Sequence, residues 1–143
     1  MFFDETVFEP IKNLAPSSLW YFLPVGYLFT IAIETPILLL GLPNKLTFKQ
    51  KLMCGIWLTA CTYPIVVLVL PMLLQDFSWV IYITIAEIFA PAGECLFFWL
   101  AFRGNKLLQT IDWIRCFIVI ILANLASFGF GEIMHYFQWF GMF

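Results

Sequence analysis

Four glutamates stand inside long apolar stretches of this sequence, where no water would solvate a carboxylate: Glu34, Glu87, Glu94 and Glu132. An ionised carboxylate in the hydrocarbon of a membrane costs roughly 2.5 kcal/mol or more, so it marks a functional or partner-pairing site. Glu87 and Glu94 are seven positions apart, which places them on one helix face about 10 Å apart along the axis. Glu34, Glu87, Glu94 and Asn124 are therefore the candidates for binding an ion or proton, or for pairing with a partner.

A buried acid without a counter-charge can be stabilised in three ways. It can stay protonated and donate a hydrogen bond, bind a proton or cation in transit, or meet a basic group or ligand from another subunit. The nearest basic residue is Arg115, which we expect only at the inner end of its apolar stretch. The sequence leaves all three outcomes open.

Metal binding and nucleophilic catalysis find little support. Glu132 and His135 form a Glu-x-x-His pair, but di-iron bundles need two such pairs and His135 is the sole histidine. We expect Glu132 and His135 at the outer rim of the membrane, as interfacial groups or a local proton relay. Ser127 and His135 are too far apart along one helix for a nucleophile and its base. The sequence therefore predicts no metal site, no catalytic residues and no enzyme, with an intramembrane enzyme on lipid or quinone as a distant alternative.

Composition defines the class of protein that holds these acids. The chain has 143 residues, of which 63% are hydrophobic and 11% charged, with a mean hydropathy of +0.96. A soluble domain spends about a quarter of its residues on charged side chains. These values exclude a soluble enzyme, a disordered tail and a nucleic-acid binder, which would need a basic face. They predict an integral membrane protein.

The acids must be positioned by membrane-spanning helices, each of which needs about 20 apolar residues. Four stretches qualify, and they cover about residues 19–42, 52–74, 77–102 and 113–136. Short polar turns separate them, so we expect an all-α, up-down-up-down four-helix bundle. Residues 1–18 carry an amphipathic stripe and are expected to lie in the membrane interface.

Basic residues set the expected orientation. Six of the seven lie at one end of the spans, so the positive-inside rule places loops 43–51 and 103–112 in the cytoplasm and both termini on the other side. We expect a bacterial inner membrane, or a thylakoid-type membrane. An aromatic belt at the outer level supports this orientation, and its members are Trp20, Tyr21, Trp79, Tyr82, Tyr136 and Trp139.

Small residues at helical spacing predict where helices pack. Ala123, Ser127 and Gly131 are four apart, which lets helix backbones approach closely in lipid. A weak internal echo between 30–36 and 84–91 aligns Glu34 with Glu87, as a parallel two-plus-two duplication would require.

Four short sets of residues, most of them polar, resemble segments of a known group of proteins. They are Glu34-Thr35-Pro36, Thr62-Tyr63-Pro64, Glu87 with Glu94, and Asn124-Leu125-Ala126-Ser127-Phe128. In these the chain resembles a loose group of small bacterial membrane proteins with about four spans, over residues 30–132. Members of that group often carry an asparagine shortly before the Thr-aromatic-Pro motif, which is Thr62-Tyr63-Pro64 here. This chain has Ala60 and Cys61 in that place. The group has no settled activity, so the resemblance implies a class and not a function.

Two functions follow as expectations. The first is a non-enzymatic accessory or assembly subunit of a larger membrane complex, because the chain has no soluble domain and Phe-rich outer faces. The alternative is an oligomeric proton- or cation-coupled carrier or channel that uses the intramembrane glutamates. The expected partners are the lipid bilayer and other membrane subunits or further copies of this chain, with no nucleic acid. No cofactor is predicted, although bound lipid, quinone or pigment would fit the Phe-rich faces.

Overall fold

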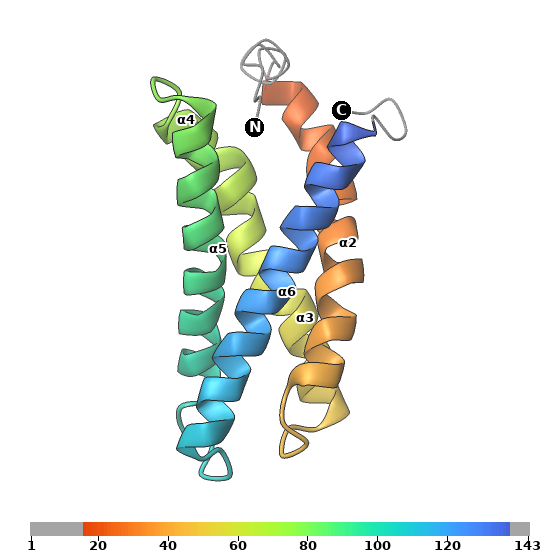
Figure 1. The fold of residues 1–143 in the computed structure, drawn as a ribbon, viewed down its shortest axis with the longest axis vertical. Helices are drawn as coiled ribbons and strands as arrows, with labels where there is room; N and C mark the ends of the chain where they lie inside the picture. The colour runs from red at the N-terminus through yellow and green to blue at the C-terminus, as the bar shows by residue number, and fades with distance from the viewer. Residues whose placement is uncertain (1–15, 138–143) are drawn as a thin grey trace.

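The computed structural model describes residues 16–137, and every regular element in that range is a helix (Figure 1). The elements are α2 (Pro16–Gly41), α3 (Phe48–Pro64), the π-helical segment η2 (Ile65–Val69), α4 (Leu70–Leu73), α5 (Trp79–Phe102) and α6 (Thr110–Tyr136). Residues 1–15 and 138–143 lie outside the described range, and with them most of the expected interfacial segment.

Four helical stretches are long and apolar enough to cross a membrane. They cover Leu23–Gly41, Phe48–Leu73, Trp79–Phe102 and Thr110–Met134, with mean hydropathies between 1.6 and 2.0. The expectation of an all-α chain with four such helices is confirmed. Successive helices run in opposite directions, so the start of α2 and the end of α6 lie at the same end of the bundle (Figure 1).

The helix α3 begins at Phe48, inside the segment expected to be a loop, because Thr47 caps it. Thr47 Oγ1 accepts a hydrogen bond from the Gln50 amide at 3.3 Å, and Gln50 Oε1 accepts one from the Thr47 amide at 2.9 Å. This reciprocal capping box satisfies two amides that have no partner within the helix. Counting apolar residues cannot find such an end, since the cap and the first turn are polar.

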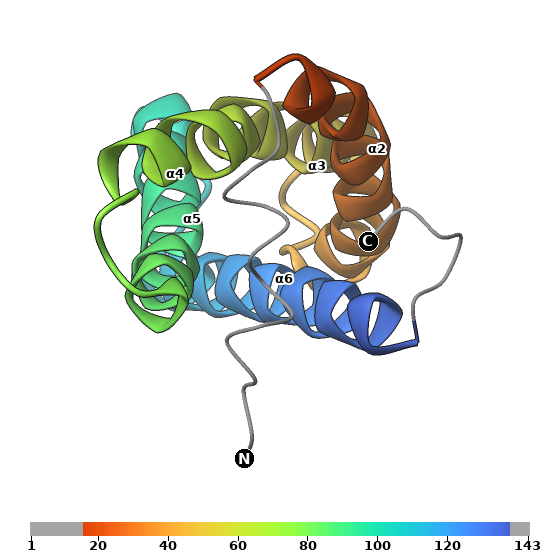
Figure 2. The same ribbon diagram turned by 90° about the horizontal axis from the view of Figure 1, so that it is seen from above.

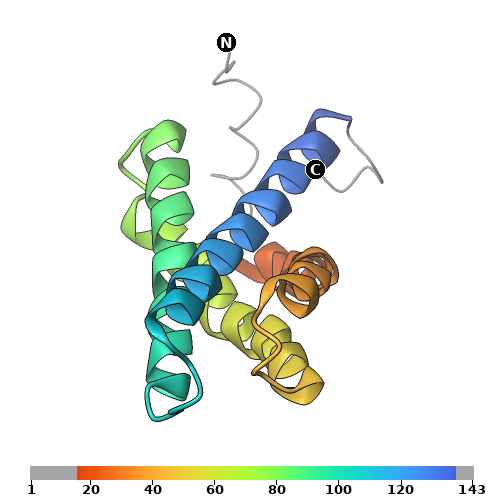
Figure 3. The same cartoon turned by 60° about the horizontal axis from the view of Figure 1, so that its bottom comes forward.

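The four long helices form a ring in the order α2, α3, α5, α6, seen from above in Figure 2. All four are inclined to the long axis of the bundle (Figures 2 and 3). Along α3 the hydrogen-bonded neighbour changes from α2 to α5, and along α6 it changes from α5 to α2. Both α3 and α6 therefore pack against α2 and α5. This arrangement decides which helices can meet at the centre of the bundle.

Apolar side chains fill the end of the ring that holds the loops between α2 and α3 and between α5 and α6. Phe98, Ile120 and Leu42 are fully shielded from solvent. The whole buried cluster consists of Leu38, Leu42, Leu46, Cys54, Leu58, Phe98, Leu108, Cys116, Ile120 and Ala123. This cluster seals that end of the bundle.

Glycines allow the closest approach between helices, although not at every expected position. A Cβ on Gly55 of α3 would lie only 2.9 Å from the Cα of Thr35 on α2, so only glycine fits there. A Cβ on Gly131 would meet nothing within 4 Å in the described part of the chain. Gly131 therefore takes no part in packing between the described helices, because none of them lies beside that face of α6. Ala123, by contrast, is buried in the core.

The π-helical segment lies between two prolines, Pro64 and Pro71. The Leu70 amide bonds to the carbonyl of Ile65, one residue further back than in an α-helix. The next carbonyl in this pattern, Val66, would need the amide of Pro71, which proline lacks. The Tyr82 hydroxyl fills the gap by donating to Val66 O at 3.1 Å. The Tyr82 hydroxyl, which was expected at the outer level of the membrane, therefore has a structural partner within the bundle.

Candidate functional site

Glu34 is buried between three helices at the centre of the bundle, with only 1% of its surface exposed. Thr59 Oγ1 of α3 lies 2.8 Å from one carboxyl oxygen, and Ser127 Oγ of α6 lies 2.7 Å from the other. Both oxygens are therefore satisfied within the chain.

Glu94 occupies a matching position on α5 and is 2% exposed. Thr62 Oγ1 of α3 lies 3.0 Å from Glu94 Oε1, and Asn124 Nδ2 of α6 lies 2.8 Å from Oε2. Asn124 thus bonds directly to the carboxyl group of Glu94. Hydrogen bonds across membrane helices contribute about 0.6 kcal/mol each, so the network also supports the bundle.

The two carboxyl sites are equivalent in their connections. Exchanging α2 with α5 and α3 with α6 converts the Glu34 site into the Glu94 site. The inclination of α3 and α6 explains this equivalence (Figure 2). On each of these helices the earlier polar residue, Thr59 or Asn124, bonds to a glutamate on one neighbouring helix. The later residue, Thr62 or Ser127, lies three positions on and bonds to the glutamate on the other neighbouring helix. The structural counterpart of Glu34 is therefore Glu94, whereas the sequence echo pairs it with Glu87.

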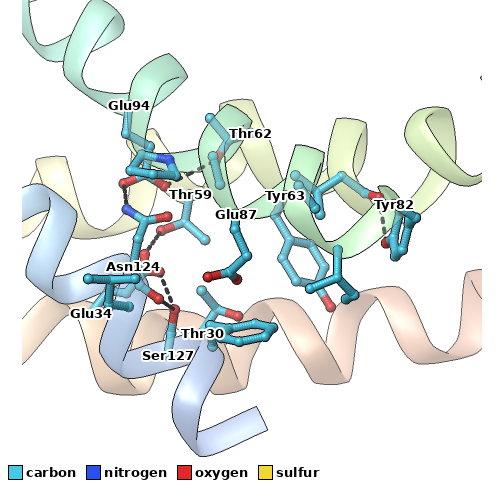
Figure 4. A pocket seen from close by; sticks show the side chains of 17 residues that line it. Thr30, Glu34, Thr59, Thr62, Tyr63, Tyr82, Glu87, Glu94, Asn124 and Ser127 are labelled. Atoms are coloured by element: carbon cyan, nitrogen blue, oxygen red, sulfur yellow. Dashed lines mark hydrogen bonds between the residues drawn. The ribbon is translucent and has the colours of Figure 1, made fainter. Parts of the chain in front are cut away.

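A cavity of about 230 Å³ adjoins both carboxyl groups (Figure 4). Glu87 of α5 points into it beside Thr30 and Tyr63, is half-buried, and has no hydrogen-bond partner among the described residues. The lining residues are Thr30, Glu34, Thr59, Thr62, Tyr63, Val66, Tyr82, Ile83, Ala86, Glu87, Ala90, Pro91, Glu94, Asn124, Leu125, Ser127 and Phe128. The structure thus brings together all four residues expected to bind an ion or proton.

No lysine, arginine or histidine of the described chain lines this cavity. Two basic residues, Lys51 and Arg115, lie at the sealed end of the bundle. Lys51 Nζ donates to Leu42 O at 2.7 Å, and Arg115 Nε donates to Gly41 O at 2.7 Å. They cap the carbonyl end of α2, where the helix dipole favours positive charge. The three glutamates consequently share the cavity without a counter-charge from any side chain that the structure describes.

Packed side chains close one end of the cavity, and the cavity extends away from that end. One helical turn beyond Glu34 and Glu94, Leu38 and Phe98 are 1% and 0% exposed, so the apolar cluster closes the cavity there. From the carboxyl pair the cavity extends the other way, toward Thr30 of α2, Tyr82 of α5 and Phe128 of α6. An ion in this cavity would be separated from the loop end by packed side chains.

The remaining site predictions have different outcomes. Glu132 is half-buried on α6 and close enough to Glu87 for electrostatic repulsion, but it does not line the cavity. His135 falls where only the helix backbone is described. Ser127, expected as a packing residue, is a hydrogen-bonding partner of Glu34.

Sequence reasoning did not assign Thr59, Thr62, Tyr63 or Tyr82 to the site. The signal for the first two was a polar pair three positions apart, which recurs on α6 as Asn124 and Ser127.

Within the described residues no three His, Cys, Asp or Glu side chains are grouped so as to hold a metal ion, and the four cysteines are free thiols. Comparisons with protein-family models, with curated proteins and with solved structures found no match.

Proposed function

We propose that this chain is a membrane-embedded carrier or channel that takes up a proton or cation at the cavity formed by Glu34, Glu87, Glu94 and Asn124. One observation carries the proposal: three glutamates from two helices share a cavity that no basic side chain of the described residues lines. Acids buried in this way in a membrane protein are expensive and are typical of ion pathways and proton relays.

Three features of the cavity support this function. Glu34 and Glu94 are held by a network that joins all four long helices, so a change in their charge acts on the whole bundle. Glu87, with no hydrogen bond of its own among the described residues, lies between them and the open part of the cavity and would be the first to meet an incoming ion. The packed cluster on the other side supplies a barrier to leakage.

The test is ion flux in proteoliposomes that contain the purified chain. Glu87→Gln and Glu94→Gln should each abolish flux while leaving the far-UV helical signal and the elution volume unchanged. Asp76→Asn is the matched control, because Asp76 is an exposed carboxylate in the turn before α5 and lies outside the cavity. Unchanged flux in both glutamine variants would refute the proposal.

The accessory-subunit hypothesis is the second candidate, and the exposed apolar surface favours it. Large apolar side chains on every long helix face outward, among them Leu40, Trp57, Ile88 and Ile121. In a complex, part of this surface would contact a partner's helices in place of lipid. Native mass spectrometry after mild-detergent purification separates the two candidates: a stoichiometric hetero-partner supports the subunit, and a monomer or homo-oligomer with flux supports the carrier.

The proposed orientation places loops 43–51 and 103–112 in the cytoplasm of a bacterium, or on the equivalent side of a thylakoid-type membrane. The support is the gathering of lysines and arginines at that end of the helices. The cavity would then face the outer side, from which a proton gradient drives uptake. A C-terminal alkaline phosphatase fusion should be active and a C-terminal fluorescent-protein fusion dark; the reverse would overturn this orientation.

A further inference from the structure

We infer that the ion taken up by the carboxyl pair is the proton, and that Glu94 holds it on Oε1, donating to Thr62 Oγ1. The inference rests on the proposed function and narrows it from protons or cations to protons. Its basis is the set of hydrogen atoms that face the four carboxyl oxygens.

Asn124 fixes which group donates the hydrogen bond to Glu94 Oε2. Its Nδ2 lies 2.8 Å from Glu94 Oε2 and 3.1 Å from the carbonyl of Ile120, and a backbone carbonyl can only accept hydrogen bonds. The amide therefore presents its NH₂ group to both, because the opposite orientation would set its oxygen against the oxygen of Ile120. An NH₂ group cannot ligate a metal cation. Of the two groups that contact the Glu94 carboxyl, only the Thr62 hydroxyl can accept a hydrogen bond, so a proton on Oε1 finds an acceptor there and a proton on Oε2 does not.

Three hydroxyls that face the pair each have a second acceptor. Each lies within hydrogen-bonding distance both of a carboxyl oxygen and of a helix carbonyl, yet carries one hydrogen. The hydroxyl-to-carbonyl distances are 3.0 Å for Thr59 to Gly55, 3.2 Å for Thr62 to Leu58, and 2.9 Å for Ser127 to Asn124. Every hydroxyl can thus donate to an ionised carboxylate, or donate to its carbonyl and accept from a protonated carboxyl.

Protonation then requires only a reversal of hydrogen-bond direction. When Glu94 is ionised, Thr62 donates to Oε1 and Asn124 donates to Oε2. When a proton binds Oε1, this oxygen donates to Thr62, which turns its own hydrogen to the carbonyl of Leu58. Each of these polar groups keeps a partner in both states, and no side chain has to change rotamer. Glu34 can take and release a proton in the same way through Thr59 or Ser127.

A metal cation is served less well than a proton at the Glu94 site. The Asn124 NH₂ group presents hydrogens to Glu94 Oε2 and cannot act as a ligand, so a cation would have to displace this hydrogen bond or leave the amide outside its coordination shell. The other titratable groups near the pair are Cys61 and Tyr63 of α3, Tyr82, Glu87 and Cys95 of α5, and Glu132 of α6 near Glu87. None of them brings a positive charge.

Infrared spectroscopy tests the bound proton without relying on transport. The purified protein should show a carboxylic-acid carbonyl band that shifts in D₂O and titrates with pH at constant Na⁺ and K⁺. Thr62→Val should move this band to higher frequency, because the carboxyl proton loses its acceptor. Thr84→Val is the control, since Thr84 also bonds to the carbonyl four residues back but is exposed outside the cavity. No such band, or one removed by adding Na⁺ or K⁺ at fixed pH, would overturn the inference.

Flux separates this inference from the proposed function. Internal acidification that is unchanged when Na⁺ or K⁺ is replaced by N-methylglucamine supports both. Uptake of Na⁺ or K⁺ that saturates and is lost in Glu94→Gln would keep the carrier and overturn proton specificity. Absence of any flux together with the infrared band would overturn the carrier and keep the bound proton.

Discussion

Gly55 is the position at which packing and the carboxyl site can be perturbed by one methyl group. A Cβ there would lie 2.9 Å from both the Cα and the Cβ of Thr35, where ordinary contacts begin at 3.4 Å. The helices α2 and α3 must therefore separate by about 0.5 Å, since backbone atoms cannot rotate away. Overpacking of this kind costs about 1–3 kcal/mol, so Gly55→Ala should lower the free energy of unfolding by that amount.

The same displacement should reach the candidate site. Thr59 lies one turn after Gly55 on α3, and Glu34 immediately precedes Thr35 on α2. The hydrogen bond between Thr59 and Glu34, now 2.8 Å, would lengthen with the helix separation. We therefore expect Gly55→Ala to reduce ion flux although the substituted residue touches no carboxyl group.

Steric trapping in bicelles measures the unfolding free energy, and the same preparation can be reconstituted for flux. Gly131→Ala is the control, because nothing in the described chain lies within 4 Å of its Cβ position, and it should be neutral or stabilise by up to about 1 kcal/mol. Adding Thr35→Ala to Gly55→Ala should restore part of the loss, since it removes the clash with the Thr35 hydroxyl but leaves the clash with the Thr35 backbone. A Gly55→Ala protein as stable and as active as Gly131→Ala would refute the reasoning.

Three further predictions concern groups that hold the helix ends and the π-helical segment. Tyr82→Phe leaves a carbonyl of that segment without a donor and should cost about 1 kcal/mol of unfolding free energy in the same trapping assay; a stability equal to wild type would mean that water or backbone rearrangement replaces the hydroxyl. Lys51→Met removes the donor from the carbonyl end of α2 and should lower stability by about 1–3 kcal/mol, with faster hydrogen exchange over 38–44; protection unchanged there would contradict the capping role. Asp112→Asn breaks the 2.6 Å ion pair with Lys45, so its small destabilisation should vanish in about 1 M salt, and a salt-independent loss would show that the ion pair is not the cause.

The sequence alone was sufficient to predict the four long helices of this protein and the polar residues within them. Few charges and four long apolar stretches are sufficient for four membrane-length helices, because hydrophobic length is a local property of the chain. The same counting singled out Glu34, Glu87, Glu94 and Asn124, since a polar residue in an apolar stretch is visible without any knowledge of packing. Helix ends were placed less well, as at Phe48, because a capping box is polar and lies outside the apolar stretch.

Only the tertiary structure decided how these residues meet. The depth and rotation of each helix depend on close approaches such as that of Gly55 to Thr35, which no periodicity within a single helix reveals. The inclination of α3 and α6 then lets two polar residues three positions apart reach two different helices. For this reason the partner of Glu34 across the bundle is Glu94, while Glu87 stays free of hydrogen bonds in the described structure and faces the cavity.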